Sequence, residues 1–349
     1  MKTVEIGGKK IGEGERCFVI AEAGVNHNGD LSLAKRLVEA AAEAGADAVK
    51  FQNFKASELI SAAAPKAKYQ SATTGDYEGQ LEMVKRLEMS EAMTRELAQH
   101  AADHQIIFLS TAFDEVSVDF LDAVGVPAFK VGSGDLTDLP LLSYIGNKRK
   151  PVLLSTGMSY LEEVKAAVTM LFASGCSQLA LFHCVSSYPS DPEAANLRAI
   201  KTLKDQFDVP VGFSDHSLGE ELAVAATALG ANLIEKHLTL DRDLPGPDHR
   251  ASLLPAEFKH MVRSIRSVEI AFGDGVKRPT QSEANVRDVA RRSIVAARTI
   301  PKGAIVTRDM LAFKRPGTGV SPALWETLLG KKTVREIPFD TLISIGDLA

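Results

Sequence analysis

Two histidines in this chain have the residue type and the placement to bind a metal ion. His216 lies in GFSDHS and His237 in EKHLTL, and each ends one of the last two short apolar runs of a series. Neighbouring strand ends would bring both imidazoles to one divalent ion and leave positions for water and a substrate oxygen. Either histidine alone fits an ordinary buried polar residue, so the matched pair carries the prediction. Oxygen-rich surroundings favour Mn²⁺, with Mg²⁺ or Co²⁺ as substitutes.

Two lysines stand inside apolar runs, Lys50 in DAVKFQ and Lys130 in PAFKVGSG. An unpaired ammonium is costly there, so we expect each lysine to face a bound anion or, alternatively, an internal carboxylate. Hydroxyls and the backbone amides of the turns GSG and STG would complete a cradle for phosphate or carboxylate. No GxGxxG or GxxxxGK[ST] motif indicates a nucleotide site. The hydroxyl candidates are Thr111, Ser133, Ser155 and Ser214.

Two loops add further candidates. PGPDH presents Asp248 on a stiff segment that follows His237, although a plain turn would also explain it. KRPGTG offers Arg315 beside a glycine-rich flank. An exposed arginine is usually a solvated charge, but a rigid one would matter if this segment covered an active site.

The elements that must position these residues are eight apolar runs of strand length that alternate with helix-period segments. One such segment, 31–44, begins after Asp30 as its N-cap and stops at Gly45. Eight strand–helix units before residue 272 predict a (β/α)8 TIM barrel, with a doubly wound open sheet as the alternative. The runs are 17–24, 47–52, 106–111, 127–134, 151–157, 179–184, 209–216 and 232–237.

Both architectures place the ligand site at the carboxyl ends of the strands, so the residues that close the runs belong together. Such a collection of charges, imidazoles and hydroxyls is costly to gather without a ligand. In chain order the residues are Glu22, Lys50 with Gln52, Thr111, Lys130 with Ser133, Ser155, His183 with Ser186, Ser214 with His216, and Glu235 with His237.

Composition changes near residue 272. We predict a catalytic barrel over 1–272, a polar, turn-rich linker over 273–285 and a small β-rich domain over 286–349. The last segment, with short strands, turns and no long helix, is marginal alone and is expected to dock on a barrel.

Overall composition excludes several classes of protein. The 349 residues carry 40 basic and 45 acidic side chains, a net charge of −5, so no global field favours nucleic acid or anionic membranes. Three cysteines, without a CxxC pair, argue against a disulfide framework and for a reducing compartment. The amino terminus lacks an apolar export signal, and no run is long enough to span a membrane. We therefore expect a cytoplasmic protein.

The ordered segments AEAGVNHNGD, GADAVKFQ, LSTAFD, FKVGSGD, LSTGM, HCVSSYP, GFSDHS, IEKH, GPDH and KRPGTG resemble the sialic acid synthases. The resemblance covers about residues 17–349. It implies a TIM barrel followed by a small antifreeze-like (SAF) domain, a domain-swapped homodimer, and condensation of phosphoenolpyruvate with an N-acylated hexosamine.

The resemblance also implies residue roles. His216 and His237 match the metal ligands, and Arg315 matches an arginine that the partner subunit contributes. Positions that contact phosphoenolpyruvate are matched by Lys50, Thr111, Lys130, Ser133, Ser155 and Ser214; positions that hold the sugar are matched by Glu22, Gln52, Tyr188 and Asp248. Two positions depart from the family pattern. Ser186, at a position predicted to contact phosphoenolpyruvate, replaces an asparagine of some members, which weakens that contact. Asp135 replaces a common glutamate, which shortens a possible acid/base carboxylate.

The reaction that the resemblance implies joins C3 of phosphoenolpyruvate to the sugar aldehyde, after which water attacks C2 and phosphate leaves. Glu22, Asp135 or a water on the metal would move the protons, and the sequence does not choose among them. N-acetylmannosamine would give N-acetylneuraminate, our first expectation; a 2,4-diacetamido-trideoxy hexose would give a legionaminate. A pyruvate-dependent aldolase and a non-catalytic carbohydrate-binding protein are remote alternatives.

Overall fold

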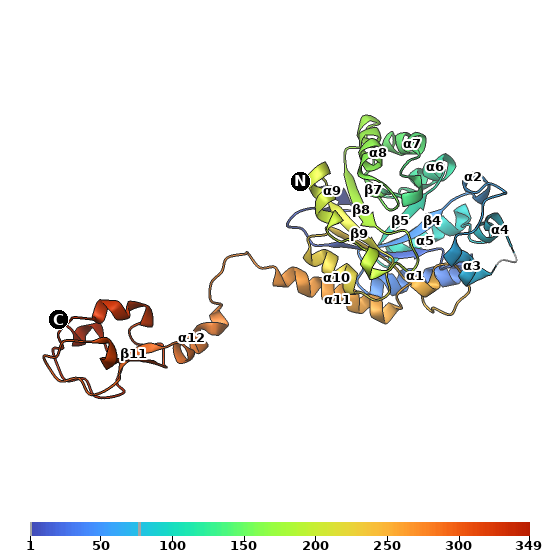
Figure 1. Cartoon of the computed structure of the whole chain (residues 1–349). Coiled ribbons are helices and arrows are strands. Elements are labelled where there is room, and N and C mark those ends of the chain that lie inside the picture. Colours follow the sequence, from blue (N-terminus) through green and yellow to red (C-terminus); the bar gives the residue numbers. More distant parts are fainter. Residues whose placement is uncertain (1, 76–77) are drawn as a thin grey trace. The chain divides into compact units, whose positions relative to one another are not determined.

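The computed structural model describes residues 2–75 and 78–349 of the chain. The chain divides into two compact units, Met1–Phe272 and Gly273–Ala349, and each is described by itself (Figure 1).

The larger unit is a closed barrel of eight parallel strands in the order β10-β3-β4-β5-β6-β7-β8-β9. The barrel closes where β10 pairs with β3, His237 lying opposite Glu22. The predicted TIM barrel is thus confirmed, and closure excludes the doubly wound alternative. Its strands are β3 (Phe18–Gly24), β4 (Ala48–Asn53), β5 (Ile107–Ala112), β6 (Phe129–Val131), β7 (Val152–Ser155), β8 (Leu179–Cys184), β9 (Val211–Asp215) and β10 (Leu233–His237).

A ring of helices covers the outside of these strands (Figure 1). The predicted start of the first helix is confirmed, because the Asp30 carboxylate accepts hydrogen bonds from the backbone amides of Ser32 and Leu33 at 2.7 and 3.2 Å. The helices are α1 (Leu31–Glu43), α5 (Glu91–Asp103), α6 (Glu115–Val124), α7 (Leu139–Gly146), α8 (Leu161–Ala173), α9 (Ala199–Phe207), α10 (Glu221–Ala228) and α11 (Pro255–Ala271).

The barrel buries two apolar layers. The larger lies between the strands and the surrounding helices, with Phe51, Phe129 and Phe213 among its members. The second fills the barrel interior and is joined by a hairpin of β1 (Val4–Ile6) and β2 (Lys9–Ile11), whose Ile6 and Ile11 are fully buried. Because this layer takes part of the interior, the polar groups collect at the carboxyl ends of the strands.

One connection of the barrel is much longer than the others. Between β4 and α5 the chain forms three short helices, α2 (Ala56–Leu59), α3 (Lys68–Thr74) and α4 (Gln80–Lys85). Long connections at the carboxyl face of a barrel commonly shape its ligand site.

The smaller unit contains the helix α12 (Ala284–Ala290), which is followed by an antiparallel pair, β11 (Ser293–Ala296) with β12 (Leu311–Lys314). Its own core gathers Ile294, Ile300, Val306 and Ile337. Among residues 2–75 and 78–349, no helix is both long and apolar enough to cross a bilayer.

Candidate active site

Strand alternation brings the polar strand ends to one place. Successive side chains of a strand face opposite sides, so residues two apart share the barrel interior. Glu235 and His237 on β10 therefore point inward together. Register then places Glu22 beside Lys50 and Thr111 beside Lys130 on adjacent strands.

Lys50 is held as a charged ammonium. Its Nζ lies 2.7 Å from Glu22 Oε2 and 3.8 Å from Glu235 Oε2, and it donates a 3.0 Å hydrogen bond to Thr111 Oγ1. Burial opposes the charge, but the two carboxylates raise the lysine pKa above its ordinary value. Burial raises the pKa of Glu22 despite the adjacent lysine. Lys50 thus already has a carboxylate partner within the protein.

Lys130 is less completely paired. Its Nζ donates to Ser155 Oγ at 2.7 Å and to Val131 O at 3.3 Å, while Glu235 Oε1 is 3.6 Å away. Burial lowers the lysine pKa, and Glu235 only partly offsets that effect. Burial also disfavours ionised Glu235, yet Lys130 and Lys50 lower its pKa to about 2. Two lysines thus share one carboxylate, leaving Lys130 charge available to an anion.

The two histidines are adjacent and poised as neutral ligands. Their ring centroids lie 5.6 Å apart, and both side chains are buried. Burial lowers the pKa of each imidazole, and His216 lowers that of His237 further. His216 Nδ1 donates to Val185 O at 2.7 Å, so its Nε2 carries the lone pair. Among the described residues, buried His237 Nδ1 has no hydrogen-bond partner.

These features fit a divalent ion. Two neutral imidazoles close together, one of them oriented by a backbone carbonyl, form the kind of donor set that binds borderline metals in proteins. Hydrogen bonds within the described residues leave His237 Nδ1 unsatisfied, and a metal would supply its missing partner.

Two tyrosines line the cavity beside the histidines. Tyr188 lies over His216 with ring centroids 4.2 Å apart and meets His237 edge-on at 5.8 Å. Tyr69, from α3 of the long connection, packs on Tyr188 at 5.1 Å. The β4–α5 connection therefore reaches His216 and His237 through the contact between these two tilted tyrosine rings.

A glycine lets two site loops approach closely. A Cβ at Gly157 would lie 2.4 Å from Ser186 Oγ and 2.9 Å from Ser133 Oγ, which are overlaps. The Gly157 amide also donates to Ser133 Oγ at 3.0 Å. The STG turn predicted to hold an anion therefore presents its backbone directly beside two hydroxyls.

A cavity of about 490 Å³ joins these groups. Among the described residues, its lining does not include Asp135, and Arg315 belongs to the smaller unit, where it is exposed. The residues predicted from sequence that line it are Glu22, Lys50, Gln52, Thr111, Lys130, Ser133, Ser155, Ser186, Tyr188, Ser214, His216, His237 and Asp248.

Two aspartates near the site hold protons unusually well. Burial and the Glu22 charge raise the pKa of Asp248 to about 7. Burial and the Asp138 charge raise the pKa of Asp135 to about 7. Either could exchange a proton near neutrality, but only Asp248 contacts the cavity.

Glu235, Cys184 and Tyr69 also line the cavity, although the sequence assigned them no role in the site. The sequence already placed Glu235 among the residues that close the runs but assigned it no role, and its position two residues before His237 puts both side chains on one face. Cys184 ends β8 and lies 3.1 Å from Ser133 Oγ, a contact without a sequence signal. Tyr69 arrives from a connection whose path only the tertiary structure reveals.

Comparisons with known proteins define the class. Residues 37–277 match the NeuB family model, and residues 291–349 match the SAF domain. The chain therefore belongs to the NeuB family and is an enzyme of the sialic acid and nonulosonate synthase class, which confirms the expected resemblance.

Three relatives illustrate its place in that family. N,N'-diacetyllegionaminic acid synthase of Campylobacter jejuni is 46% identical over 94% of this chain and 99% of its own. Human N-acetylneuraminate-9-phosphate synthase is 38% identical over 96% of this chain and 94% of its own. The crystal structure of N-acetylneuraminic acid synthetase from Leptospira borgpetersenii, 35% identical, superposes with a TM-score of 0.73 over 82% of this chain and 95% of its own.

Proposed function

We propose that this enzyme condenses phosphoenolpyruvate with the open-chain form of an N-acylated hexosamine. The observation that carries the proposal is that two buried lysines and two buried neutral imidazoles line the same cavity. Lysines and hydroxyls suit the phosphate and carboxylate of phosphoenolpyruvate, whereas neutral imidazoles suit a divalent ion beside an aldehyde oxygen.

The proposed reaction forms a carbon–carbon bond and breaks the bond between C2 of phosphoenolpyruvate and its phosphate group. C3 of phosphoenolpyruvate bonds to the aldehyde carbon, whose oxygen gains a proton. Water adds at C2, the C2–O bond to the phosphate breaks, and both water protons are given up, one to the former aldehyde oxygen and one to the departing phosphate, which leaves a 2-oxo acid. Lys130 and Lys50 hold the anionic groups and stabilise the charge that develops as phosphate leaves. A divalent ion bound by His216 and His237, with Mn²⁺ the expected species, would polarise the aldehyde oxygen.

Carboxylates on the sugar side are placed to bind hydroxyls and to move protons. Glu22 Oε1 accepts a 2.9 Å hydrogen bond from Gln52 Nε2, so the two side chains form one polar unit at the end of β3 and β4. Asp248, with its pKa near 7, is the better candidate for proton transfer than Asp135, because it lines the cavity.

For the acceptor we propose a 2,4-diacetamido-trideoxy hexose, ahead of the N-acetylmannosamine favoured by sequence alone. The β4–α5 connection lines the cavity with Leu59, Ile60, Met83, Val84 and Leu87. A trideoxy sugar with two acetamido methyls and a terminal methyl would bury more apolar surface there than a sugar rich in hydroxyls. Higher identity to a legionaminic than to a neuraminic acid synthase also supports this choice.

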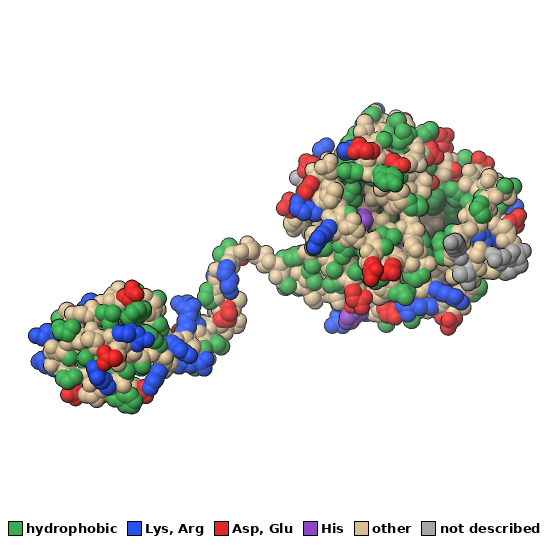
Figure 2. Space-filling view, viewed as in Figure 1, with side chains coloured by type: hydrophobic (Ala, Val, Ile, Leu, Met, Phe, Trp, Pro, Cys, Tyr) green, Lys and Arg blue, Asp and Glu red, His purple; other side chains and the backbone are tan. Residues whose placement is uncertain are grey.

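We further propose a homodimer in which the SAF domain of one chain covers the barrel of the other. The smaller unit has 13 Lys and Arg against 8 Asp and Glu, and Figure 2 shows basic side chains over its visible face. The barrel unit has 27 basic and 37 acidic residues, so the two charges are complementary.

One assay tests the reaction and the acceptor. Purified enzyme with Mn²⁺ and phosphoenolpyruvate should release phosphate only when a sugar is added, whereas a pyruvate aldolase would release none. We expect kcat/KM for the diacetamido sugar to exceed that for N-acetylmannosamine by at least about tenfold, the worth of one or two buried methyl groups. Equal values would contradict the acceptor while leaving the reaction intact.

Metal dependence is tested separately. Chelator-treated enzyme should lose turnover and regain it with Mn²⁺, and His216→Ala should prevent the recovery. Full turnover in protein shown by elemental analysis to be metal-free would exclude the histidine-bound ion.

A further inference from the structure

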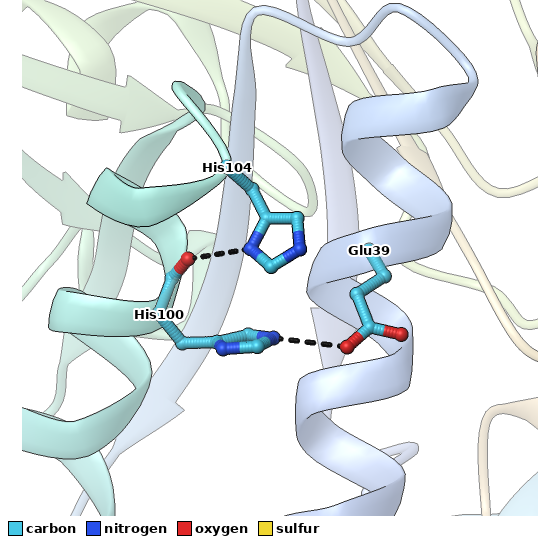
Figure 3. A group of neighbouring side chains, drawn as sticks. All are labelled: Glu39, His100 and His104. Carbon is cyan, nitrogen blue, oxygen red and sulfur yellow. Dashed lines mark hydrogen bonds and ion pairs between the residues drawn. The ribbon is translucent and has the colours of Figure 1, made fainter.

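Away from the cavity, two neighbouring barrel helices direct three metal-ligand side chains at one another. Glu39 lies on α1, His100 lies on α5, and His104 caps the carboxyl end of α5 (Figure 3). One ligand atom from each residue lies within 4.8 Å of the others. None of the three lines the cavity, so the cluster is separate from the His216–His237 pair.

Helix periodicity creates the imidazole pair. Residues four apart lie on the same helix face, one turn above the other. The rings of His100 and His104 accordingly approach to 4.4 Å between centroids. Because α1 packs beside α5, the Glu39 carboxylate reaches the same face, and its Oε1 lies 3.1 Å from His100 Nε2.

Hydrogen bonding orients the second imidazole as a ligand. His104 Nδ1 donates to the backbone carbonyl of His100 at 2.9 Å, which leaves the lone pair on Nε2. A backbone acceptor on the other ring nitrogen is the usual support of a metal-binding histidine. Figure 3 shows this ring held on the side of α5 that faces α1.

We propose that Glu39, His100 and His104 form a second divalent-metal site, of the Zn²⁺ class, that links α1 to α5. Two imidazoles and a carboxylate are an established zinc donor set and leave a position for water. With bonds of about 2.0 Å, tetrahedral ligand atoms lie roughly 3.3 Å apart. Glu39 is 44% exposed and His104 is exposed, so side-chain rotation can close the remaining gap.

The site is expected to stabilise rather than to catalyse, because it binds two outer helices and touches no cavity residue. An ion bound to folded protein alone raises the unfolding temperature as its concentration rises. The competing interpretation is that His100 and Glu39 form an ordinary surface hydrogen bond without a metal.

Zinc titration distinguishes the two. The His216→Ala/His237→Ala variant lacks the two cavity histidines, and chelator treatment removes any metal it carries. Native mass spectrometry and calorimetry with Zn²⁺ should then find one ion per chain. Adding His100→Ala and His104→Ala should weaken that binding by at least about a hundredfold, since two of three ligands are lost. The matched control is His260→Ala, which removes another exposed histidine bonded to a carboxylate, Glu220 Oε1 at 2.6 Å, and should retain the ion.

A second measurement avoids the cavity variant, whose zinc binding could change if its replacements disturbed folding. In the otherwise native chain, His100→Ala/His104→Ala should lower the zinc count from two to one and keep Mn²⁺-dependent turnover, with an unchanged circular dichroism spectrum. Absence of a second zinc in the native chain, or a zinc count that the double replacement does not change, would overturn the proposal.

Discussion

Lys236 and Asp215 form an ion pair directly behind His216 and His237, with Nζ 2.8 Å from Oδ2 and both side chains 0% exposed. Their neighbours on each strand line the cavity, so by alternation this pair occupies the opposite face of the barrel wall. Lys236 also donates to Ser217 O at 2.6 Å, and Asp215 accepts from Ser217 N at 2.9 Å. The pair therefore fixes the ends of β9 and β10 relative to each other.

Replacing Asp215 with Asn should destabilise the barrel by about 3–5 kcal/mol, because Lys236 would remain as an uncompensated buried charge. Displacement of the strand ends should also weaken Mn²⁺ binding. Urea unfolding followed by circular dichroism and Mn²⁺ titration measure the two effects. The control is Asp205→Asn, which breaks an exposed ion pair with Lys201 and should cost less than about 1 kcal/mol. Similar losses in both variants would refute a special role for the buried pair.

Replacing Lys130 and replacing Lys50 should have different effects on substrate binding. Lys130→Met keeps the apolar stem and deletes the less completely paired of the two lysine charges, so phosphoenolpyruvate affinity should fall by about 2–3 kcal/mol, roughly 30- to 150-fold. Lys50→Met should lose phosphoenolpyruvate affinity comparably and also disturb sugar binding, because Glu22 loses its 2.7 Å partner. Calorimetry with each substrate decides this, and unchanged phosphoenolpyruvate binding in both variants would show that the anion lies elsewhere.

The strands could be predicted from the sequence because parallel strands buried on both faces are continuous apolar runs. Ligands of such barrels bind at the carboxyl ends of the strands, and the eight apolar runs therefore predict that Glu22, Lys50 and His237 lie at one rim. The same logic extends to Glu235, whose position two residues before His237 fixes its direction.

Contacts outside the strands could not be predicted in this way. Asp135 follows β6 in the segment GSGD, whose position at a strand end predicts a site residue. Asp135 instead lies in the 3₁₀ turn Ser133–Asp135, and it is not among the residues that line the cavity. Tyr69 reaches the site through a long connection whose helices are too short to have a clear period. Both positions depend on the tertiary path of a loop, which local sequence does not encode.

Acid should destabilise the barrel through two buried histidines, His27 and His249, at 0% and 1% exposure. Burial lowers the pKa of each to about 4 from 6.5. The unfolded chain therefore binds protons first as pH falls, so stability is complete above pH 6.5 and is lost toward pH 4. By pH 5 each histidine should cost about 2 kcal/mol.

Urea unfolding at pH 7 and pH 5 measures this dependence. His27→Asn, which can still accept the 2.9 Å hydrogen bond from the Gly29 amide, should reduce the pH slope while His260→Asn at an exposed position should not. A slope unchanged by His27→Asn would assign the acid sensitivity to other groups.

Subunit mixing tests whether Arg315 completes the site of a partner chain. Arg315→Ala chains would have intact histidines but no partner arginine, and His237→Ala chains would have the reverse defect, so each parent should be nearly inactive. In a mixed dimer with exchanged SAF domains, one barrel has both histidines and receives an intact Arg315. There the guanidinium can bind sugar oxygens and help exclude water. Activity should therefore return in about half of the sites of each mixed dimer, the count set by two-fold symmetry.

The control for this exchange is a mixture of Arg315→Ala chains with Lys331→Ala chains. The Lys331→Ala chain loses another basic side chain of the smaller unit, but it keeps Arg315 and an intact barrel. Since that second parent is expected to be active alone, mixing should add nothing beyond the average of the two. Native mass spectrometry must detect the mixed dimer in both cases. If the Arg315→Ala and His237→Ala dimer forms and its rate does not exceed the sum of its parents, each chain uses its own arginine or none, because only exchange across subunits can restore a complete site from two defective chains.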